Sequence, residues 1–294
     1  MYSDEQIIKC HGQESLEHLN HKNIGGRNSS RGNRYEDKFA LRELAAAAVR
    51  YYQNGEVRKL FTQVRTYVDD LIVTEENFWI HYQIKDVIKL AWGKEKKSLK
   101  DNFQKQVEIN KFINNAAITQ TNIVVSSKSL HKSLKCNIPP SLKRNSDVIW
   151  FPNLNVEHYS DFPSIKIGLD VLSSTKKPMP ADRIHLLMYV FGCWCNCKSD
   201  EGISIIEFIN ILSQHKNCYV RLAPYVVDDE LKNALVSIPG FNFNTERGYF
   251  NWSFSVTDEG HLQYPCESQK FVEFRERVMN ANPKDFDSLE VFLL

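Results

Sequence analysis

The sequence lacks any stretch that approaches ~20 consecutive apolar residues, the length that a membrane-spanning helix needs. Residues 1–13 lack the apolar core of a signal peptide, because Asp4, Glu5 and Lys9 interrupt them. The seven cysteines are odd in number and irregularly spaced, which does not suit a disulfide framework. These absences predict a cytoplasmic protein with reduced thiols and no membrane partner.

Internal repeats, low-complexity tracts and phosphate-binding glycine loops are also missing, since Gly25-Gly26 and Gly240 lack the required spacing. Any ATP-driven step would therefore need a separate subunit. What is present is the composition of a soluble globular protein, with 42% apolar and 25% charged residues. A length of 294 residues is enough for two domains of ordinary size.

The net charge of +1 conceals an asymmetry along the chain. Residues 200–294 contain 8 basic and 15 acidic side chains, a net charge of −7, whereas residues 1–199 contain 29 and 21, a net charge of +8. A basic first part and an acidic second part are typical of a phosphate-binding domain joined to a protein-binding one, although charge also fluctuates along chains without function.

Hydrophobic periodicity and turn residues predict an α/β protein in which a mixed sheet is flanked by helices. The predicted helices are 35–53, 99–114, 128–135, 181–193, 203–213 and 271–279. The predicted strands are 66–74, 78–86, 119–126, 148–151, 241–243 and 249–256. The short link Glu75-Glu76-Asn77 predicts a hairpin between the first two strands.

The predicted hairpin contains polar residues that a strand would not bury without partners. Because side chains alternate along a strand, Gln83 and Lys85 share one face, and a tight hairpin brings Asp70 beside them. A hard cation such as Mg²⁺ (or Mn²⁺) takes oxygen ligands, which Asp70 and the Gln83 carbonyl would supply. Lys85 would activate water or stabilise the transition state, and Glu36 would add a second carboxylate.

Asp70 followed by three apolar residues, a turn and a strand ending in Gln83-Ile84-Lys85 resembles the PD-(D/E)XK nuclease core in its Q-x-K variant. Asp69 stands where the family often has proline, and Glu36 resembles the glutamate that many members carry on their first helix. The stretches GNRYEDKFAL, VDDLIV and YQIKD are most similar to effector nucleases of bacterial anti-phage systems of CBASS and Lamassu type.

This resemblance implies a restriction-endonuclease-like core and Mg²⁺-dependent cleavage of double-stranded DNA. The expected division is a poorly ordered segment (1–25), the nuclease domain (26–155), a linker (156–180) and a C-terminal α+β module (181–294). We expect that module to bind regulatory partners of a defence complex or to form a homo-oligomer in the active state. The alternatives are a non-catalytic adaptor with a degenerate nuclease fold, and a sequence-specific restriction endonuclease.

Basic residues near the predicted site suit a polyanionic substrate. Residues 126–146 contain no acidic side chain, and such a surface neutralises phosphates without reading bases. The DNA-binding candidates are Lys89, Lys128, Lys132, Lys143 and Arg144. Without a functional role, each lysine would simply be a solvated surface residue. Asp70, Gln83 and Lys85 would then form the polar face of an ordinary hairpin.

Two further features carry weaker predictions. Cys193, Cys195 and Cys197 could bind zinc, but no second cysteine pair accompanies them, so buried thiols are the preferred interpretation. Residues 203–222 with 241–256 could form a winged helix-turn-helix. The acidic charge of that half opposes DNA docking and favours contact with protein.

Overall fold

The chain divides into two units, of which unit 1 comprises residues 1–171 and 177–212 and unit 2 comprises residues 172–176 and 213–294. The computed structural model of the protein describes residues 2–26, 30–113, 118–175, 177–213, 220, 225–245, 248–255, 258–266 and 268–293. Over those ranges we find no helix with both the length and the apolar character needed to cross a membrane.

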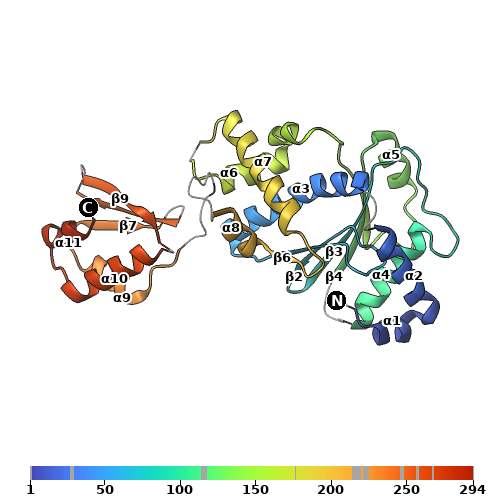
Figure 1. Ribbon diagram of the computed structural model, residues 1–294, viewed down its shortest axis with the longest axis horizontal. Coiled ribbons are helices and arrows are strands. Elements are labelled where there is room, and N and C mark those ends of the chain that lie inside the picture. Colours follow the sequence, from blue (N-terminus) through green and yellow to red (C-terminus); the bar gives the residue numbers. More distant parts are fainter. Residues whose placement is uncertain are drawn as a thin grey trace. The chain divides into compact units, whose positions relative to one another are not determined.

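Unit 1 is built on a six-stranded sheet in the order β5-β4-β3-β2-β1-β6 (Figure 1). Strand β3 runs parallel to β4, and β4 runs parallel to β5, while the remaining pairs are antiparallel. The predicted mixed sheet of an α/β protein is thereby confirmed. The strands are β1 (Lys59–Thr62), β2 (Leu71–Glu75), β3 (Phe78–Lys85), β4 (Ile118–Val125), β5 (Ser146–Trp150) and β6 (Ile203–Ser204).

Helices cover both faces of this sheet (Figure 1). Helix α3 (Ser30–Asn54) packs on one face, where the rings of Phe39 and Tyr82 lie 5.0 Å apart. Helix α4 (Leu99–Ile113) covers the opposite face, because its Gln106 contacts His81, the neighbour of Tyr82 in β3. Helix α5 (Lys128–Cys136) joins α4 in one apolar cluster and begins at the capping residue Ser127.

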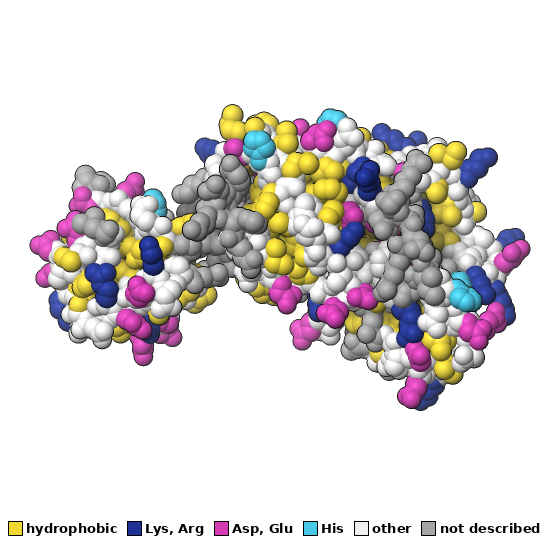
Figure 2. Space-filling view, in the orientation of Figure 1, with side chains coloured by type: hydrophobic (Ala, Val, Ile, Leu, Met, Phe, Trp, Pro, Cys, Tyr) yellow, Lys and Arg dark blue, Asp and Glu magenta, His cyan; other side chains and the backbone are white. Residues whose placement is uncertain are grey.

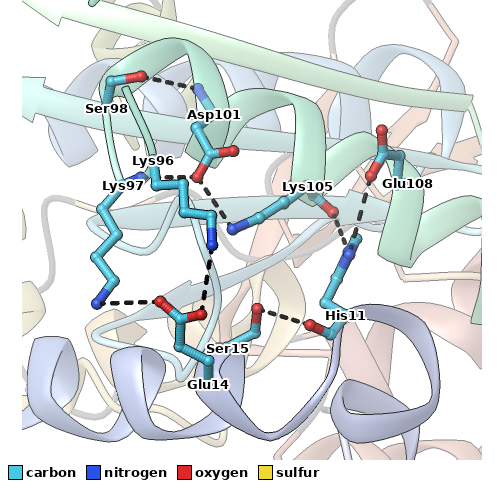
Figure 3. Close-up of polar contacts among 9 residues, drawn as sticks. All are labelled: His11, Glu14, Ser15, Lys96, Lys97, Ser98, Asp101, Lys105 and Glu108. Atoms are coloured by element: carbon cyan, nitrogen blue, oxygen red, sulfur yellow. Dashed lines mark hydrogen bonds and ion pairs between the residues drawn. The ribbon is translucent and has the colours of Figure 1, made fainter. Parts of the chain in front are cut away.

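The N-terminal residues form helices α1 (Asp4–His11) and α2 (Gln13–Gly26), so the prediction of a poorly ordered segment over 1–25 is wrong. Ser3 and Gln6 make a reciprocal capping box at the start of α1. The ion pairs of Glu14 on α2 with Lys96 and Lys97, just before α4, are exposed and contribute little (Figure 3). Docking is driven by a buried cluster of Tyr2, Ile7, Leu16, Leu19, Tyr67 and Ile109.

The boundary predicted at residues 180 and 181 also lies elsewhere, since residues 177–212 belong to unit 1. The predicted linker instead contains helices η1 (Val156–Asp161) and α6 (Pro163–Leu172). Helix α7 (Pro180–Cys197) buries Trp194 against α3, and β6 pairs with β1 and forms the edge of the sheet. Helix α8 (Ile205–Ser213) completes this region and buries four apolar side chains.

Unit 2 has its own apolar core beneath a three-stranded antiparallel sheet in the order β7-β8-β9. Five Phe side chains fill much of this core, and Phe250 and Phe271 are fully enclosed. The α+β character predicted for the C-terminal module therefore describes unit 2. Its elements are α9 (Asp229–Val236), β7 (Phe241–Asn244), β8 (Tyr249–Phe254), β9 (Asp258–Pro265), α10 (Gln269–Ala281) and α11 (Phe286–Leu293).

The predicted winged helix-turn-helix is not formed by the described residues. Ile203 and Ser204 pair with β1, and α8 lies in unit 1, whereas residues 241–254 lie in the sheet of unit 2. Residues 214–219 and 221–222 of the proposed motif lie outside the described part of the chain. The two halves of the motif thus belong to different units.

Candidate active site

The hairpin β2–β3 brings Asp70, Gln83 and Lys85 together, as strand alternation predicts. Leu71 pairs with Tyr82, and continuing this register places Asp70 opposite Gln83. One oxygen of Asp70, Oδ2, accepts three hydrogen bonds: from Gln83 Nε2 at 2.5 Å, from the Ile84 backbone N–H at 2.6 Å and from Lys85 Nζ at 3.1 Å. This carboxylate is therefore held in one orientation at the end of β3.

Gln83 contacts Asp70 through its amide nitrogen. The sequence had instead predicted that the side-chain carbonyl oxygen of Gln83 binds the metal. A donated hydrogen bond makes Gln83 a support that orients the carboxylate. Gln83 is 4% exposed, in keeping with such a fixed position. Asp86 lies apart, accepting hydrogen bonds from Ser126 at 2.6 Å and from Asn153 at 2.8 Å.

A buried polar network holds the irregular segment that precedes Asp70. Gln106 Oε1 accepts hydrogen bonds from the backbone N–H groups of Tyr67 at 3.0 Å and Val68 at 3.2 Å. His81 Nδ1 lies 3.2 Å from Val68 O, which can only accept, so Nδ1 carries the proton. These contacts replace the strand pairing that the sequence predicted for residues 66–70 and fix the path of the chain into the site.

The same network keeps His81 neutral. Its Nε2 faces the side-chain nitrogens of Asn110 at 3.0 Å and Gln106 at 3.4 Å, which are donors. Burial lowers the pKa of His81 to about 4, although the contact with the Val68 carbonyl opposes the shift. His81 is thus a structural histidine whose ring is uncharged at neutral pH.

Glu36 is brought to the site by helix α3. Its Oε2 accepts a hydrogen bond from Gln63 Nε2 at 3.0 Å. Gln63 follows β1 with φ of 54°, a left-handed conformation that directs its amide toward the helix. Burial, followed by the negative charge of Asp70, raises the pKa of Glu36 from 4.5 to about 8, against the opposing effect of Lys85.

Lys85 is the cation of this group. Its side chain is 38% exposed, so the ammonium reaches solvent while it contacts Asp70. Burial lowers its pKa, but Asp70, Asp69 and Glu36 together outweigh that effect and raise the pKa above its ordinary value. Lys85 is therefore fully protonated at neutral pH and acts as a fixed positive charge beside two carboxylates.

A small cavity of about 70 Å³ lies beside the two carboxylates Glu36 and Asp70. Glu36 and Asp70 line it from different elements, α3 and the start of β2. A volume of this size holds one ion with one or two water molecules, each of which occupies roughly 30 Å³ in the liquid. The complete lining is Glu36, Asp37, Thr62, Gln63, Asp70, Leu71 and Lys198.

Two charged residues of this lining were missed by the sequence analysis. Lys198 Nζ contacts both oxygens of Asp37, at 2.5 and 2.7 Å, and Trp194 Nε1 donates to Asp37 Oδ1 at 3.2 Å. Asp37 directly follows Glu36, and that adjacency is a signal the sequence did contain. Lys198 has no such signal, because it lies 161 residues from Asp37 and falls in the region assigned to another domain.

The side chains that line the cavity meet one requirement for binding Mg²⁺, the presence of two carboxylates. Mg²⁺ commonly binds one or two carboxylates and keeps water and substrate phosphate as its other ligands, which Glu36 and Asp70 allow. Among the described residues, no group of three or more His, Cys, Asp or Glu side chains is placed to hold a metal ion. Burial and the repulsion from Asp70 raise the Glu36 pKa, and a bound cation would oppose both effects.

The predicted DNA-binding residues all lie exposed on unit 1. Lys128 and Lys132 are one turn apart on α5, and the Lys128 ammonium lies 4.6 Å from the Trp150 ring centroid. Parallel strands end at a common edge, so α5, which follows β4, begins at the edge where β3 ends in Lys85. Lys89 follows β3 directly, whereas Lys143 and Arg144 precede β5.

The cysteine cluster lies on helix α7 and spreads around it. Cys193 and Cys197 are one turn apart and half-buried, whereas Cys195 is exposed beside Asp37, so the prediction of buried thiols is wrong. Burial followed by neighbouring Cys193 raises the pKa of Cys197 to about 11. A zinc ligand must lose its proton, and this shift opposes that loss.

A larger hollow of about 450 Å³ lies over the sheet of unit 2. Three of its six polar lining residues are asparagines, Glu259 is the one carboxylate, and no lysine is among the lining residues. It therefore lacks the paired carboxylates and cation found in unit 1. Acidic side chains are conspicuous on the surface of unit 2 (Figure 2).

Comparison with known proteins adds no assignment: no family model, no curated protein and no solved structure matches the chain. A function can therefore be argued only from the residues and geometry of the site.

Proposed function

We propose that the protein is a Mg²⁺-dependent (or Mn²⁺-dependent) DNA endonuclease. The observation that carries this proposal is the Asp70 carboxylate, fixed by Gln83, the Ile84 amide and Lys85, with Glu36 lining the same cavity. Two carboxylates and a lysine form the charge pattern that hydrolysis of a phosphodiester requires.

In this mechanism Glu36 and Asp70 would hold the divalent cation from α3 and the start of β2. A bound cation would supply the positive charge that acidifies the attacking water and offsets charge on the phosphate. Lys85 keeps its proton and places positive charge where the phosphate oxygens become more negative in the transition state. Gln83 keeps the Asp70 carboxylate from rotating, and the network of Gln106 and His81 keeps its backbone in place.

Double-stranded DNA is the proposed substrate because Lys89, which follows β3, and Lys128, at the start of α5, lie at the edge of the sheet where β3 ends in Lys85. These exposed residues and Lys132 would contact phosphates and would not read bases, whereas Lys143 and Arg144 precede β5 and lie toward the opposite edge. DNA binding should then weaken steeply as salt rises. Cleavage would produce a smear of fragments, whereas a sequence-specific restriction enzyme would produce discrete bands.

The deciding experiment is plasmid cleavage with Mg²⁺ or Mn²⁺ by the wild type and by Asp70→Asn, Lys85→Ala and Glu36→Gln. Each substitution should lower the cleavage rate by about 100-fold or more, since each removes a charge that acts in the transition state. The matched control is Asp86→Asn, which alters a neighbouring charge outside the cavity. Equal rates in all variants would remove the assignment and leave the adaptor with a degenerate nuclease fold.

The resemblance to anti-phage effectors supports a further proposal, that a partner or self-assembly in a defence complex activates the nuclease. An unregulated nuclease of low specificity would damage the DNA of its own cell. Unit 2 suits the partner-binding role, because its residues 172–176 and 213–294 contain 12 acidic and 9 basic side chains, a net charge of −3, and Val226, Val236 and Val291 are exposed. A purified chain that cleaved DNA at full rate by itself would contradict regulation by assembly.

A further inference from the structure

The cavity that holds Glu36 and Asp70 also contains a second lysine, Lys198, which comes from the far end of helix α7. Lys198 contacts both oxygens of Asp37, at 2.5 and 2.7 Å. The two partners differ in exposure, since the side chain of Lys198 is 26% exposed and that of Asp37 only 9%. The carboxylate is thus enclosed, while the lysine keeps a solvent-facing side in the cavity.

The position of Lys198 is fixed from three directions. Its backbone N–H ends helix α7 by donating to Trp194 O at 3.0 Å. The next residue, Ser199, accepts a hydrogen bond from the Thr62 backbone N–H at 3.0 Å, which ties this point to the end of β1. Asp37 on α3 holds the ammonium. A lysine on a flexible four-carbon side chain is in this way placed within a defined site.

A simple structural role would be to neutralise Asp37 and fasten α7 to α3. Asp37, however, has other donors besides the lysine, namely Trp194 Nε1 at 3.2 Å and the Cys195 thiol at 3.9 Å. The indole of Trp194 is itself fully buried, so α7 is anchored on α3 by apolar packing as well. Fastening the helix therefore does not explain why a cation faces the cavity.

The charges in the cavity favour a substrate role. Glu36, Asp37 and Asp70 bring negative charge that would repel a phosphodiester, and a bound cation offsets part of it. Lys85 already contacts Asp70 on one side of the cavity. A second lysine on the α7 side supplies positive charge where an approaching phosphate would otherwise meet Asp37.

We propose that Lys198 binds a non-bridging phosphate oxygen of the DNA substrate with the ammonium hydrogen that its contacts with Asp37 do not use. This inference rests on the proposed nuclease function and extends the substrate site to residues 177–212. The lysine shares its ammonium hydrogens between Asp37 and the phosphate, since an ammonium has three donors and Asp37 has two oxygens.

The test compares Lys198→Gln with Asp37→Asn, because both remove the same ion pair but only one removes the lysine. Binding of a fluorescent DNA duplex is measured by anisotropy over a range of salt concentrations, with Ca²⁺ in place of Mg²⁺ and with gels to check that the duplex stays intact. The control is Arg183→Gln, which breaks the ion pair with Asp170 at the other end of α7. Lys198→Arg tests whether a positive charge alone rescues binding, and thermal melting checks that every variant is folded.

Lys198→Gln should weaken binding by about tenfold or more relative to Asp37→Asn and reduce the slope of log affinity against log salt by about 1. Asp37→Asn keeps an amide oxygen that accepts from the ammonium and removes the competing negative charge, so it should bind DNA at least as tightly as the wild type, as should Arg183→Gln. Lys198→Arg should keep the wild-type salt slope. Equal losses in Lys198→Gln and Asp37→Asn, or no loss in Lys198→Gln, overturns the proposal.

Cleavage of plasmid by the wild type separates this inference from the function on which it rests. If the wild type neither binds nor cleaves DNA, the nuclease proposal fails. If the wild type cleaves while Lys198→Gln and Asp37→Asn behave alike, the nuclease stands and Lys198 is only part of an ion pair that fastens α7.

Discussion

At the scale of single residues, the ionisation of Glu36 carries the most information about the site. Its pKa rises from 4.5 to about 8 because the carboxyl is buried and faces Asp70. Between these two values the folded protein holds a proton that the unfolded chain releases. The free energy of unfolding therefore falls as pH rises through this window, and the loss is complete above about pH 8.

Glu36→Gln should remove this pH dependence, since glutamine has a similar shape and no charge. In the absence of divalent cations the variant should gain stability relative to the wild type as pH rises from about 5 to 8, by about 3–5 kcal/mol in total. Urea denaturation at a series of pH values measures the difference. The matched control is Glu76→Gln, an exposed glutamate in the turn after β2, which should show no such trend.

A difference between Glu36→Gln and the wild type that stayed constant from pH 5 to 8 would contradict the raised pKa. At pH 8, addition of a divalent cation should make the wild type more stable than Glu36→Gln. The cation binds the charged Glu36 carboxylate of the wild type, and the variant lacks this ligand.

At the scale of elements, the path of residues 66–70 decides where Asp70 lies. Gln106 is 0% exposed, and its Oε1 accepts from the N–H groups of Tyr67 and Val68. Helix α4 thus holds the segment that leads into β2. The sequence pattern could not reveal this, because a run of apolar residues from Tyr67 looks like the continuation of a strand, and only the facing helix supplies a competing acceptor.

Gln106→Leu should destabilise the fold and weaken the site together. Loss of the acceptor leaves two buried N–H groups unpaired, at about 1–3 kcal/mol each, and frees the segment that carries Asp70. Urea denaturation and plasmid cleavage should both report a loss. Gln104→Leu is the control on the same helix, where the amide reaches only the exposed Ser141 hydroxyl, and both measurements should stay near wild type. Full cleavage activity in folded Gln106→Leu would show that α4 does not position Asp70.

At the scale of the whole molecule, two separate apolar cores predict two unfolding events. The core of unit 2 is formed within residues 225–293 and includes Phe274, which is 2% exposed. The candidate active site is formed entirely by unit 1. Stability in one unit should therefore be separable from chemistry in the other.

Phe274→Ala should lower one calorimetric transition and leave the other in place, since truncation of a buried Phe costs about 3–5 kcal/mol. Phe103→Ala, in the core of unit 1 beneath β4, is the matched variant and should lower the other transition. At temperatures below the first calorimetric transition, Glu36 in Phe274→Ala should ionise with pH as it does in the wild type. A single transition that shifts as one in both variants would show that the units unfold together.

The sequence by itself determined the elements whose signals are local. Alternation in β3 and the two-residue turn after Glu75 fixed the register that joins Asp70 to Gln83 and Lys85. Long apolar periodicity gave α3, α4, α7 and α10 within a few residues of their ends. The nuclease chemistry and the partners remain predictions, which the cleavage and binding experiments address.

Only the tertiary structure decided the rest. Helices α1 and α2 are polar over most of their length and form because three apolar side chains, Ile7, Leu16 and Leu19, pack against α4. Strand β1 is four residues long and exists through its pairing with β2 and β6. Lys198 reaches Asp37 because α7 packs on α3, and a contact between residues 161 positions apart has no local signal in a sequence.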